Sequence, residues 1–256
     1  LITFFLFQFT WREIWVGIGT CIIIIFLPLV YWLGRLLKSN NHDSSNSGLT
    51  KSKKNLIVSW NRSQVLKDLR FYQVLPGLLA SPFIVTGVFF HQIHLIETKS
   101  WSITLLASSY PFFALSVIGV TFGAGWIIDR FGTVHLLRFF LLPLAFGLLL
   151  IVATDKAFAI PIFMILMGAS AGSATIIIST LWVELYGINY LGSIRSMFFS
   201  MVVLATSISP ALMGLLLDIG VKLEIQFIIF AIYIFICSII FAILTPNLLI
   251  ARSPPS

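Results

Sequence analysis

The sequence predicts an all-α protein that crosses a membrane several times, and two features of its composition indicate this. Hydrophobic residues make up 59% of the 256 residues and charged residues only 10%, whereas a soluble domain carries about 25% charged residues. The apolar residues are also gathered into runs of about 20, the length that a membrane-spanning helix needs. So few charges cannot cover a water-facing surface, and we therefore expect a polytopic membrane protein.

The apolar runs predict seven spanning helices. A short apolar stub, residues 1–9, precedes the first of them; we interpret it as the tail of an earlier span and expect the chain to be a fragment. The next residues, "TWRE" at 10–13, are interpreted as a short turn. The predicted spans are, in chain order, 14–34, 71–94, 103–128, 134–153, 158–182, 193–217 and 225–244.

One long polar segment, residues 35–70, separates the first span from the other six. Its middle, "SNNHDSSNSGLTKSKKN", is rich in Ser, Asn and Lys, which is typical of a flexible linker. Its end, "SWNRSQVLKDLR", fits either an ordinary solvated loop or a short amphipathic helix on the membrane surface. In the second interpretation three apolar side chains enter the bilayer and three basic ones face lipid phosphates: Trp60, Val65 and Leu69 against Arg62, Lys67 and Arg70.

Lys and Arg are unequally distributed between the two sides of the membrane. If the spans alternate in direction, 12 of the 16 Lys and Arg residues lie on one side and 4 on the other. Since the richer side is normally cytoplasmic, we expect the polar segment and the C-terminus to be inside the cell. The net charge of +7 therefore reflects orientation in the membrane, and no nucleic-acid partner is expected.

The stretch "GWIIDRFG" places an Asp–Arg pair directly after the third predicted span. Gly125 would let neighbouring helices approach closely, and Gly132 suits a tight turn with a positive φ. Asp129 and Arg130 can pair with each other or with charges on neighbouring helices at the membrane boundary. We therefore expect this stretch to form a short turn with a role beyond connecting two spans.

This stretch resembles the G-x-x-x-D-R-x-G signature of the major facilitator superfamily, which joins spans 2 and 3 of that family and recurs between spans 8 and 9. The family signature usually continues with two basic residues, where Thr133 and Val134 stand here. One span, a long basic loop and two more spans precede the stretch, which resembles the family's spans 6 to 8. The resemblance implies that the chain covers spans 6 to 12, divided as follows: 1–34, the end of the N-terminal lobe (a stub of span 5 and span 6); 35–70, the cytoplasmic central loop; 71–246, the six-span C-terminal lobe; 247–256, a cytoplasmic tail.

A second turn, "WVELYGINYLGSIRS", resembles one that is common in bacterial members of the same family. It carries Glu184 at the end of the fifth span and Arg195 at the start of the sixth. In the family such residues form a cytoplasmic charge cluster with the Asp–Arg motif. The resemblance therefore implies a gating cluster of Asp129, Arg130, Glu184 and Arg195, which alternating access breaks and remakes. A static anchor at the level of the lipid headgroups is the other interpretation.

Family resemblance also places the second and fifth spans along a central cavity. A small-to-polar face of the second span ends in His91 and His94, with Gln92 between them. A histidine in an apolar span is a functional candidate, and it can exchange a proton near neutral pH. Alternatively, both histidines lie at the outer headgroup level and only form hydrogen bonds there. Tyr110, next to a proline in the third span, could turn its phenol toward the pathway.

The fifth span contains "GASAGSAT", in which Gly168 and Gly172 have the spacing of a close helix-packing pair. Ser170 and Ser173 could instead line the cavity, and the sequence leaves both interpretations open. No Lys, Arg, Asp or Glu lies near the middle of the last six spans. Phrases such as "FFHQIHLIETKSWS" resemble bacterial members near the monocarboxylate and oxalate/formate porters, but a carboxylate substrate would require a cationic partner that these spans lack.

We expect a secondary active transporter of a small solute, coupled to an ion or to protons, in the inner or plasma membrane of a bacterium. Its expected partners are the solute, membrane lipid and an N-terminal lobe. A membrane sensor or scaffold that kept this fold without transporting is the alternative. A membrane enzyme would require a cluster of catalytic side chains, which the sequence does not show, so we predict no catalytic residue, cofactor or metal site.

Overall fold

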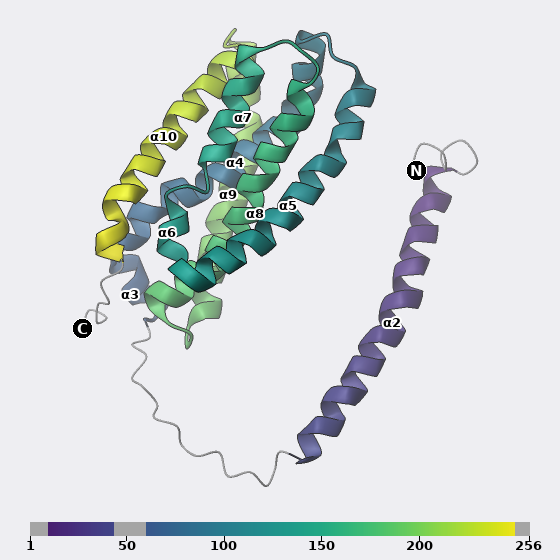
Figure 1. Cartoon of the computed structure of the whole chain (residues 1–256), viewed down its shortest axis with the longest axis vertical. Helices are drawn as coiled ribbons and strands as arrows, with labels where there is room; N and C mark the ends of the chain where they lie inside the picture. Colours follow the sequence, from purple (N-terminus) through teal and green to yellow (C-terminus); the bar gives the residue numbers. More distant parts are fainter. Residues whose placement is uncertain (1–9, 44–59, 249–256) are drawn as a thin grey trace. The chain divides into compact units, whose positions relative to one another are not determined.

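The computed structural model describes residues 10–43 and 60–248, which form helices and turns and include no strand. Helix α2 (Trp11–Asp43) lies in one compact unit, Leu1–Leu56, and the other helices lie in a second, Ile57–Ser256 (Figure 1). Seven helices in the described ranges are long and apolar enough to cross a membrane. The predicted all-α polytopic fold is therefore confirmed. The expectations for the stub, for residues 44–55 of the linker and for residues 249–256 of the tail concern residues outside those ranges. Residues 39–43, predicted as flexible linker, are instead the last residues of α2.

Helix α2 begins with a capping box rather than with the turn that the sequence suggested. The backbone N–H and the hydroxyl of Thr10 donate to Glu13 Oε2 at 2.8 and 2.9 Å. A side chain of the first turn thus accepts the hydrogen bond of a backbone N–H that has no partner within the helix. These hydrogen bonds, the backbone one most strongly, lower the pKa of the Glu13 carboxyl. The helix continues to Asp43, well past the predicted end of the first span.

Six further spans form the second unit, which we call the six-span lobe. A short helix, α3 (Arg62–Lys67), leads into the first of them, and the spans then alternate in direction (Figure 1). Their bounds lie within a few residues of the predicted ones. The long helices are α4 (Leu69–Thr98), α5 (Ile103–Phe131), α7 (Leu142–Ala153), α8 (Ala159–Tyr186), α9 (Leu191–Asp218) and α10 (Leu223–Leu248).

The predicted span 134–153 is interrupted near its start. A short helix, α6 (Thr133–Leu137), is followed by a turn before α7 begins. Pro143, near the start of α7, has no N–H and cannot donate to the carbonyl of Phe139. The N–H of Leu142 donates to that carbonyl instead, at 3.0 Å. The proline thus explains why the span is divided into two helices.

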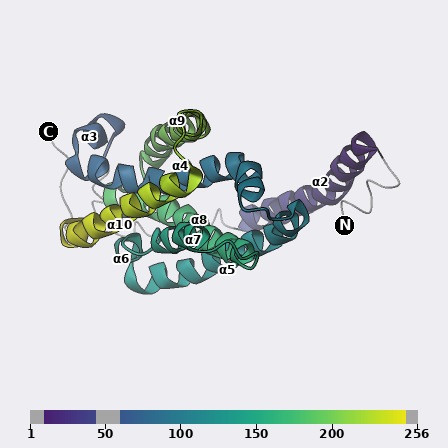
Figure 2. The same cartoon turned by 90° about the horizontal axis from the view of Figure 1, so that it is seen from above.

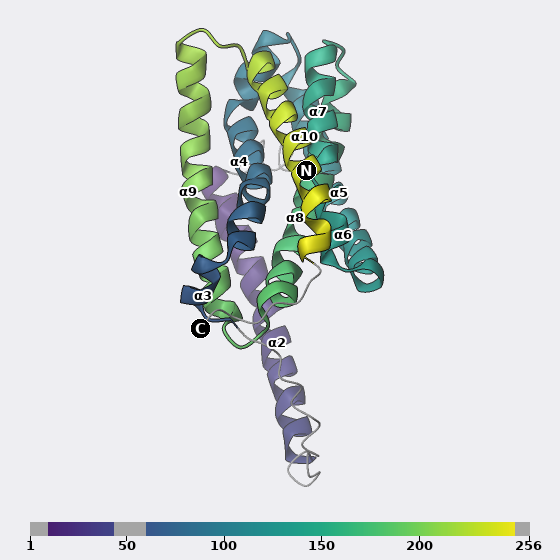
Figure 3. The same ribbon diagram turned by 90° about the vertical axis from the view of Figure 1, so that its left-hand side faces the viewer.

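Helix α8 is the central helix of the lobe, whereas α5 and α9 lie at opposite edges (Figure 2). In its spanning part, 50% of the α8 residues are buried, against 11% of those in α5 and in α9. On another side of the lobe, α4 lies between α9 and α10 (Figure 3). The long helices thus differ in how much of their surface is left for lipid or for another protein.

The lobe has two ends, which we name for use below. The α3 end contains the start of α4, the turn from α5 to α6, the turn from α8 to α9 and the last turn of α10 (Figure 1). The opposite end contains the connections from α4 to α5, from α7 to α8 and from α9 to α10.

Candidate functional site

A hollow of about 280 Å³ lies between α4, α8 and α9, near the middle of each helix. Its polar side chains are Ser81 of α4 and Thr175 of α8, and Thr175 Oγ1 donates to the carbonyl of Ala171 at 3.0 Å. Pro82, also in the wall, cannot donate a helical hydrogen bond to the carbonyl four residues earlier. The hollow therefore offers hydroxyl groups, and its lining carries no charge. Sequence reasoning did not select these residues, although the adjacent Ser81 and Pro82 were a usable signal.

The small-to-polar face predicted on α4 packs against neighbouring helices and does not line this hollow. A Cβ atom added at Gly77 would lie 2.2 Å from Phe241 Cζ of α10, and one added at Gly87 would lie 2.3 Å from Met213 Sδ of α9. A side chain at either position would have to displace these neighbouring side chains, so both glycines favour the close approach of α4 to α9 and α10. Small residues of this face thus serve helix packing, and Ala80 and Ile84 of the same face line a separate hollow between α4, α9 and α10.

The polar residues near the end of α4 lie in different surroundings. His91 Nδ1 donates to the carbonyl of Gly87 at 2.9 Å, so Nε2 is the acceptor nitrogen of the neutral ring. Tyr110 of α5 donates to Gln92 Oε1 at 2.5 Å. His94 is exposed. The structure thus joins Gln92 to Tyr110, and no hydrogen bond in the described part of the chain joins either histidine to that pair.

The pair of Gln92 and Tyr110 lies in a tightly packed region. The Tyr110 ring stacks on Phe89 with the ring centroids 6.1 Å apart. The space beside Gln92, between α4, α5 and α8, measures about 10 Å³, at most the size of a single water molecule. A solute therefore has no room in the space between these helices beside Gln92.

The glycine pair of α8 forms the contact with α5. A Cβ atom at Gly168 would lie 2.6 Å from the carbonyl oxygen of Phe113, and one at Gly172 would lie 2.6 Å from that of Val117. The backbones of the two helices therefore approach so closely that only glycine fits at these positions. This supports the packing interpretation of the G-x-x-x-G spacing.

The two serines beside these glycines are turned inward. Ser170 is fully buried, and its hydroxyl has no hydrogen-bond partner among the described residues. Ser173 is also buried and donates to the carbonyl of Ala169 at 2.8 Å. Neither serine lines the hollow, which takes its α8 wall from the adjacent face of that helix.

The Asp–Arg turn ends α5 as the sequence predicts. Gly132 has a φ of +82° and its N–H donates to the carbonyl of Ile128 at 2.7 Å, which confirms the predicted need for glycine. Gly125 lies beside open space in the lobe, because a Cβ atom there would meet nothing within 4 Å. It does not bring two helices of the lobe together.

Asp129 and Arg130 are both exposed at the α3 end. The Arg130 guanidinium lies over the rings of Trp126 and Phe131, 5.9 and 5.6 Å from their centroids. Such cation–π contacts at an exposed site stabilise by about 0.5–1 kcal/mol. The charges of this turn are therefore directed to the surface of the lobe.

Glu184 binds the start of α6 and thereby ties that helix to α8. Glu184 Oε1 accepts hydrogen bonds from the backbone N–H of Thr133 at 3.1 Å and from its hydroxyl at 2.7 Å. The N-cap residue, Gly132, has no side chain that could do this. A carboxylate at a helix N-terminus satisfies an otherwise unpaired N–H and interacts favourably with the helix dipole.

Arg195 binds the backbone of α8 instead of an acidic side chain. Its Nη2 atom donates to the carbonyl of Ser179, whose own hydroxyl donates to the preceding turn of α8. In the described part of the chain no ion pair joins Asp129, Arg130, Glu184 or Arg195 to one another. Of the four predicted cluster residues, Glu184 and Arg195 thus make contacts between helices of the lobe, although Glu184 is also exposed, like Asp129 and Arg130.

A buried ion pair at the α3 end escaped the sequence analysis. Arg70 Nε lies 2.9 Å from Asp68 Oδ2, with both side chains about 95% buried. The Tyr186 hydroxyl donates to the same oxygen at 3.1 Å. The N–H of Trp60 donates to the Tyr186 carbonyl at 3.0 Å, and the Trp60 ring covers the Arg70 guanidinium at 5.5 Å. These contacts tie the segment before α4 to the end of α8.

The surface-helix interpretation of "SWNRSQVLKDLR" is therefore wrong for half of its residues. A helix forms there, with a capping box between Asn61 and Gln64. However, Trp60, Val65 and Arg70 are buried in the lobe, whereas Leu69 and the basic residues of α3 remain exposed. The capping box and the nearby acidic residue at position 68 were the signals of an ordered segment.

The opposite end is joined by a salt-bridged lysine. Lys99, after α4, lies 2.5 Å from Asp155 Oδ1 and 3.7 Å from Glu224 Oε1 at the start of α10. The Trp101 indole N–H donates to the Asp155 carbonyl at 2.6 Å. One lysine thus links three connections of the lobe.

No three His, Cys, Asp or Glu side chains in the described ranges lie close enough together to hold a metal ion. None of the curated proteins compared with the chain matches it. A family model described as Major Facilitator Superfamily matches residues 1–210, more than half of the chain. That match includes the Asp–Arg turn and all the helices from α2 to α8. The chain belongs to the Major Facilitator Superfamily.

Proposed function

We propose that the chain acts in secondary active transport of a small solute, by alternating access and with energy from an ion or proton gradient. Membership in a superfamily of membrane transporters is the observation that carries this proposal. The apolar helices make the protein an integral, multi-pass membrane protein. In alternating access, one lobe rocks against another around a central solute site.

The contacts inside the six-span lobe support its movement as one body. Glu184 ties α8 to α6, Arg195 ties α9 to α8, and Lys99 joins three connections at the opposite end. Each contact lies within the lobe, so rocking of the lobe as a whole need not break any of them. The exposed Asp129 and Arg130 are the cluster residues that remain for gating contacts with a second lobe.

We place the solute in the hollow between α4, α8 and α9. Its walls supply the hydroxyls of Ser81 and Thr175 and no charge, so they suit a solute that is recognised by hydrogen bonds. A monocarboxylate would need a cation from elsewhere, because an uncompensated carboxylate in the membrane is costly. The proposal therefore favours a neutral solute.

His91 is the proposed proton carrier of this lobe. It is partly buried, and its Nε2 atom would lie 3.5 Å from a Cβ atom added at Gly214 of α9. A proton taken up by Nε2 would charge a ring that faces another helix, and such a charge can favour one conformation over another. His94 is exposed, whereas His91 is partly buried, and we therefore do not propose His94 as a proton carrier.

Orientation follows from the basic residues. Among the described residues of the lobe, the α3 end carries six Lys or Arg residues and the opposite end carries three: Arg62, Lys67, Arg70, Arg130, Arg138 and Arg195 against Lys99, Lys156 and Lys222. This supports a cytoplasmic α3 end and C-terminus in an inner or plasma membrane. Cysteines introduced at the exposed Ser63 and Ser100 test it, since only the second should react with an impermeant reagent added outside cells.

The decisive experiment is uptake by vesicles that contain the protein. A panel of labelled neutral and anionic solutes is offered with and without an imposed pH gradient. We expect gradient-dependent uptake of a neutral solute, its loss in His91→Gln, and its retention in His94→Gln as the matched control. Folded protein that binds a solute without moving it would overturn the proposal and favour the sensor or scaffold alternative. Equal effects of the two histidine variants would reject only the proposed role of His91 and would leave the transport proposal standing.

A further inference from the structure

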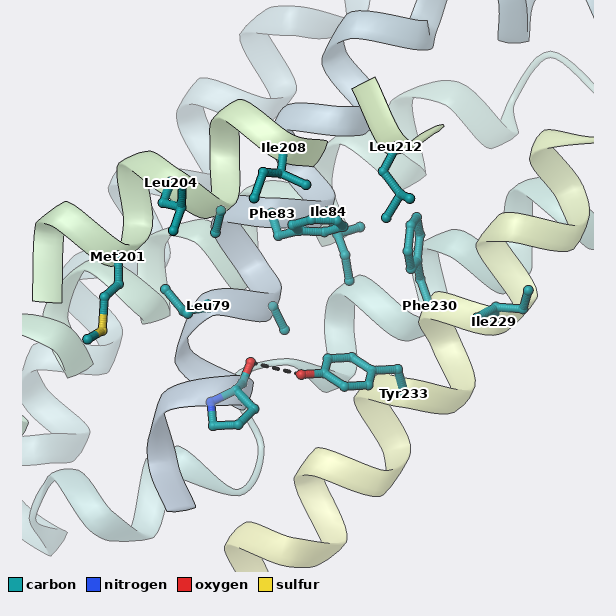
Figure 4. Close-up of a pocket in the computed structure, with 13 residues that line it drawn as sticks. Leu79, Phe83, Ile84, Met201, Leu204, Ile208, Leu212, Ile229, Phe230 and Tyr233 are labelled. Carbon is teal, nitrogen blue, oxygen red and sulfur yellow. Dashed lines mark hydrogen bonds between the residues drawn. The ribbon is translucent and has the colours of Figure 1, made fainter. Parts of the chain in front are cut away.

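A second, larger hollow of about 490 Å³ lies on another side of α4, between α9 and α10 (Figure 4). We call it the α9–α10 groove. The Tyr233 hydroxyl donates to the carbonyl of Pro76 at 3.1 Å, so the polar atoms seen in its wall are bonded to each other. The remaining wall is hydrocarbon and thioether, formed mainly by Leu79, Phe83, Met201, Leu204, Ile208 and Leu212.

The edges of this groove are open to the surroundings of the lobe. Leu204 and Ile208 of α9 are 62% and 48% exposed, and Ile229 of α10 is 53% exposed. On α9 the lining extends from Met201 to Leu212, so the groove runs along the helix and therefore along the membrane-spanning direction. An apolar surface of this kind is stable in a membrane when hydrocarbon covers it.

The apolar surface continues from the groove toward the α3 end. Leu69, Tyr72, Pro76 and Leu79 follow one another at steps of three or four residues, which places them on one face of α4. Leu69 is 67% exposed and Tyr72 is 46% exposed, and the Tyr72 hydroxyl donates to the carbonyl of Leu66 at 3.0 Å. The stripe therefore leads from the groove to α3 without being covered by another described part of the lobe.

Positive charge lies where this stripe ends. Arg62 and Lys67, at the two ends of α3, are exposed, whereas the acidic Asp68 beside them is buried against Arg70. Basic side chains at the boundary of a membrane attract anionic headgroups. An apolar groove that leads to a basic helix at the membrane boundary matches a molecule with an acyl chain and a phosphate.

We propose that the α9–α10 groove binds one acyl chain of a phospholipid whose anionic headgroup lies against Arg62 and Lys67. The lipid belongs to the leaflet at the α3 end, because the exposed apolar stripe on α4 runs from the groove to that end. This site is separate from the hollow proposed for the solute, which lies between α4, α8 and α9.

The test uses the full chain in nanodiscs that contain a phosphatidylglycerol analogue with a photoreactive diazirine on one acyl chain. After illumination, mass spectrometry maps the labelled peptides. We expect the strongest label on Met201, Leu204 and Ile208. Ala205→Trp fills the groove with an indole and should lose this label. Ala114→Trp, on an exposed part of α5, is the matched control and should keep it.

A second variant, labelled with two different lipid analogues, keeps the test decisive if Ala205→Trp does not fold. The double variant Arg62→Gln, Lys67→Gln changes only exposed side chains. It should lower groove labelling by the anionic analogue and leave labelling by a phosphatidylcholine analogue unchanged. Label spread equally over the groove and the exposed face of α5 would mean ordinary surrounding lipid and would overturn the proposal. Crosslinks between two copies through Leu204 would show a second chain in the groove and would also overturn it.

Discussion

The two ends of the six-span lobe are held together by different kinds of polar contact. At the α3 end the Asp68–Arg70 pair is buried and hydrogen bonded to Tyr186, and Glu184 binds a helix N-terminus. At the opposite end the partners of Lys99 include Asp155, whose side chain is 80% exposed. The Lys99 side chain is itself buried, but water can hydrate Asp155 when the lysine is lost, whereas water has little access to Asp68 and Arg70. Similar charged residues should therefore differ in how much they stabilise the lobe.

This difference separates stabilising charges from charges available for gating. Glu184 and Arg195 are used inside the lobe, so their loss should weaken it whether or not they also take part in transport. Asp129 and Arg130 are exposed and make little contact inside the lobe beyond the rings beside Arg130. A gating role is therefore best tested at these two residues, where stability is least affected.

The largest effect is expected for Asp68→Ala. It removes the carboxylate that pairs with Arg70 and accepts from Tyr186, and breaking one partner of a buried pair costs about 3 kcal/mol or more. The free energy of unfolding is measured by titration with denaturing detergent in mixed micelles. Asp218→Ala, at the exposed end of α9, is the control, with an expected change within about 0.5 kcal/mol. Equal losses in the two variants would contradict the contrast between buried and exposed charges.

An intermediate effect is expected for Glu184→Ala. The variant leaves the N–H of Thr133 without its acceptor, and loss of a helix cap costs about 1–2 kcal/mol. Glu184→Gln keeps an acceptor oxygen and should recover part of the loss. Hydrogen exchange at the Thr133 amide is the specific measurement, because exchange should become faster in the alanine variant. An unchanged exchange rate would show that Glu184 does not cap α6.

The smallest effect is expected for Lys99→Ala at the opposite end. Ion pairs with an exposed partner stabilise by about 1 kcal/mol or less, and added salt should reduce the difference from the unaltered chain. Lys156→Ala is the matched control, since that side chain is exposed nearby without a salt bridge among the described residues. A loss as large as that of Asp68→Ala, insensitive to salt, would remove the distinction between the two ends.

Part of the candidate site could be predicted from local sequence. Gly132 was identified because a turn with positive φ favours glycine, and Gly168 and Gly172 because their spacing is typical of close packing. The partner of Glu184 could not be predicted, since Thr133 is 51 residues away and on another helix. The surroundings of Ser170 and Gly77 could not be decided from the sequence for a similar reason. A small residue in a span faces a neighbour, a cavity or lipid according to how the helices are arranged.

The sequence by itself determined the number, the positions and the alternation of the spans. An apolar run of about 20 residues has one stable form in a membrane, a helix that satisfies its own backbone hydrogen bonds. The sequence also determined where the runs end, through Gly132 and the polar turns. Only the tertiary structure decided which face of each helix is covered, because a helix that is apolar all round carries no periodic signal to separate neighbour from lipid. For that reason the buried pair at Arg70, the two hollows and the exposed edges of α5 and α9 emerged from packing alone.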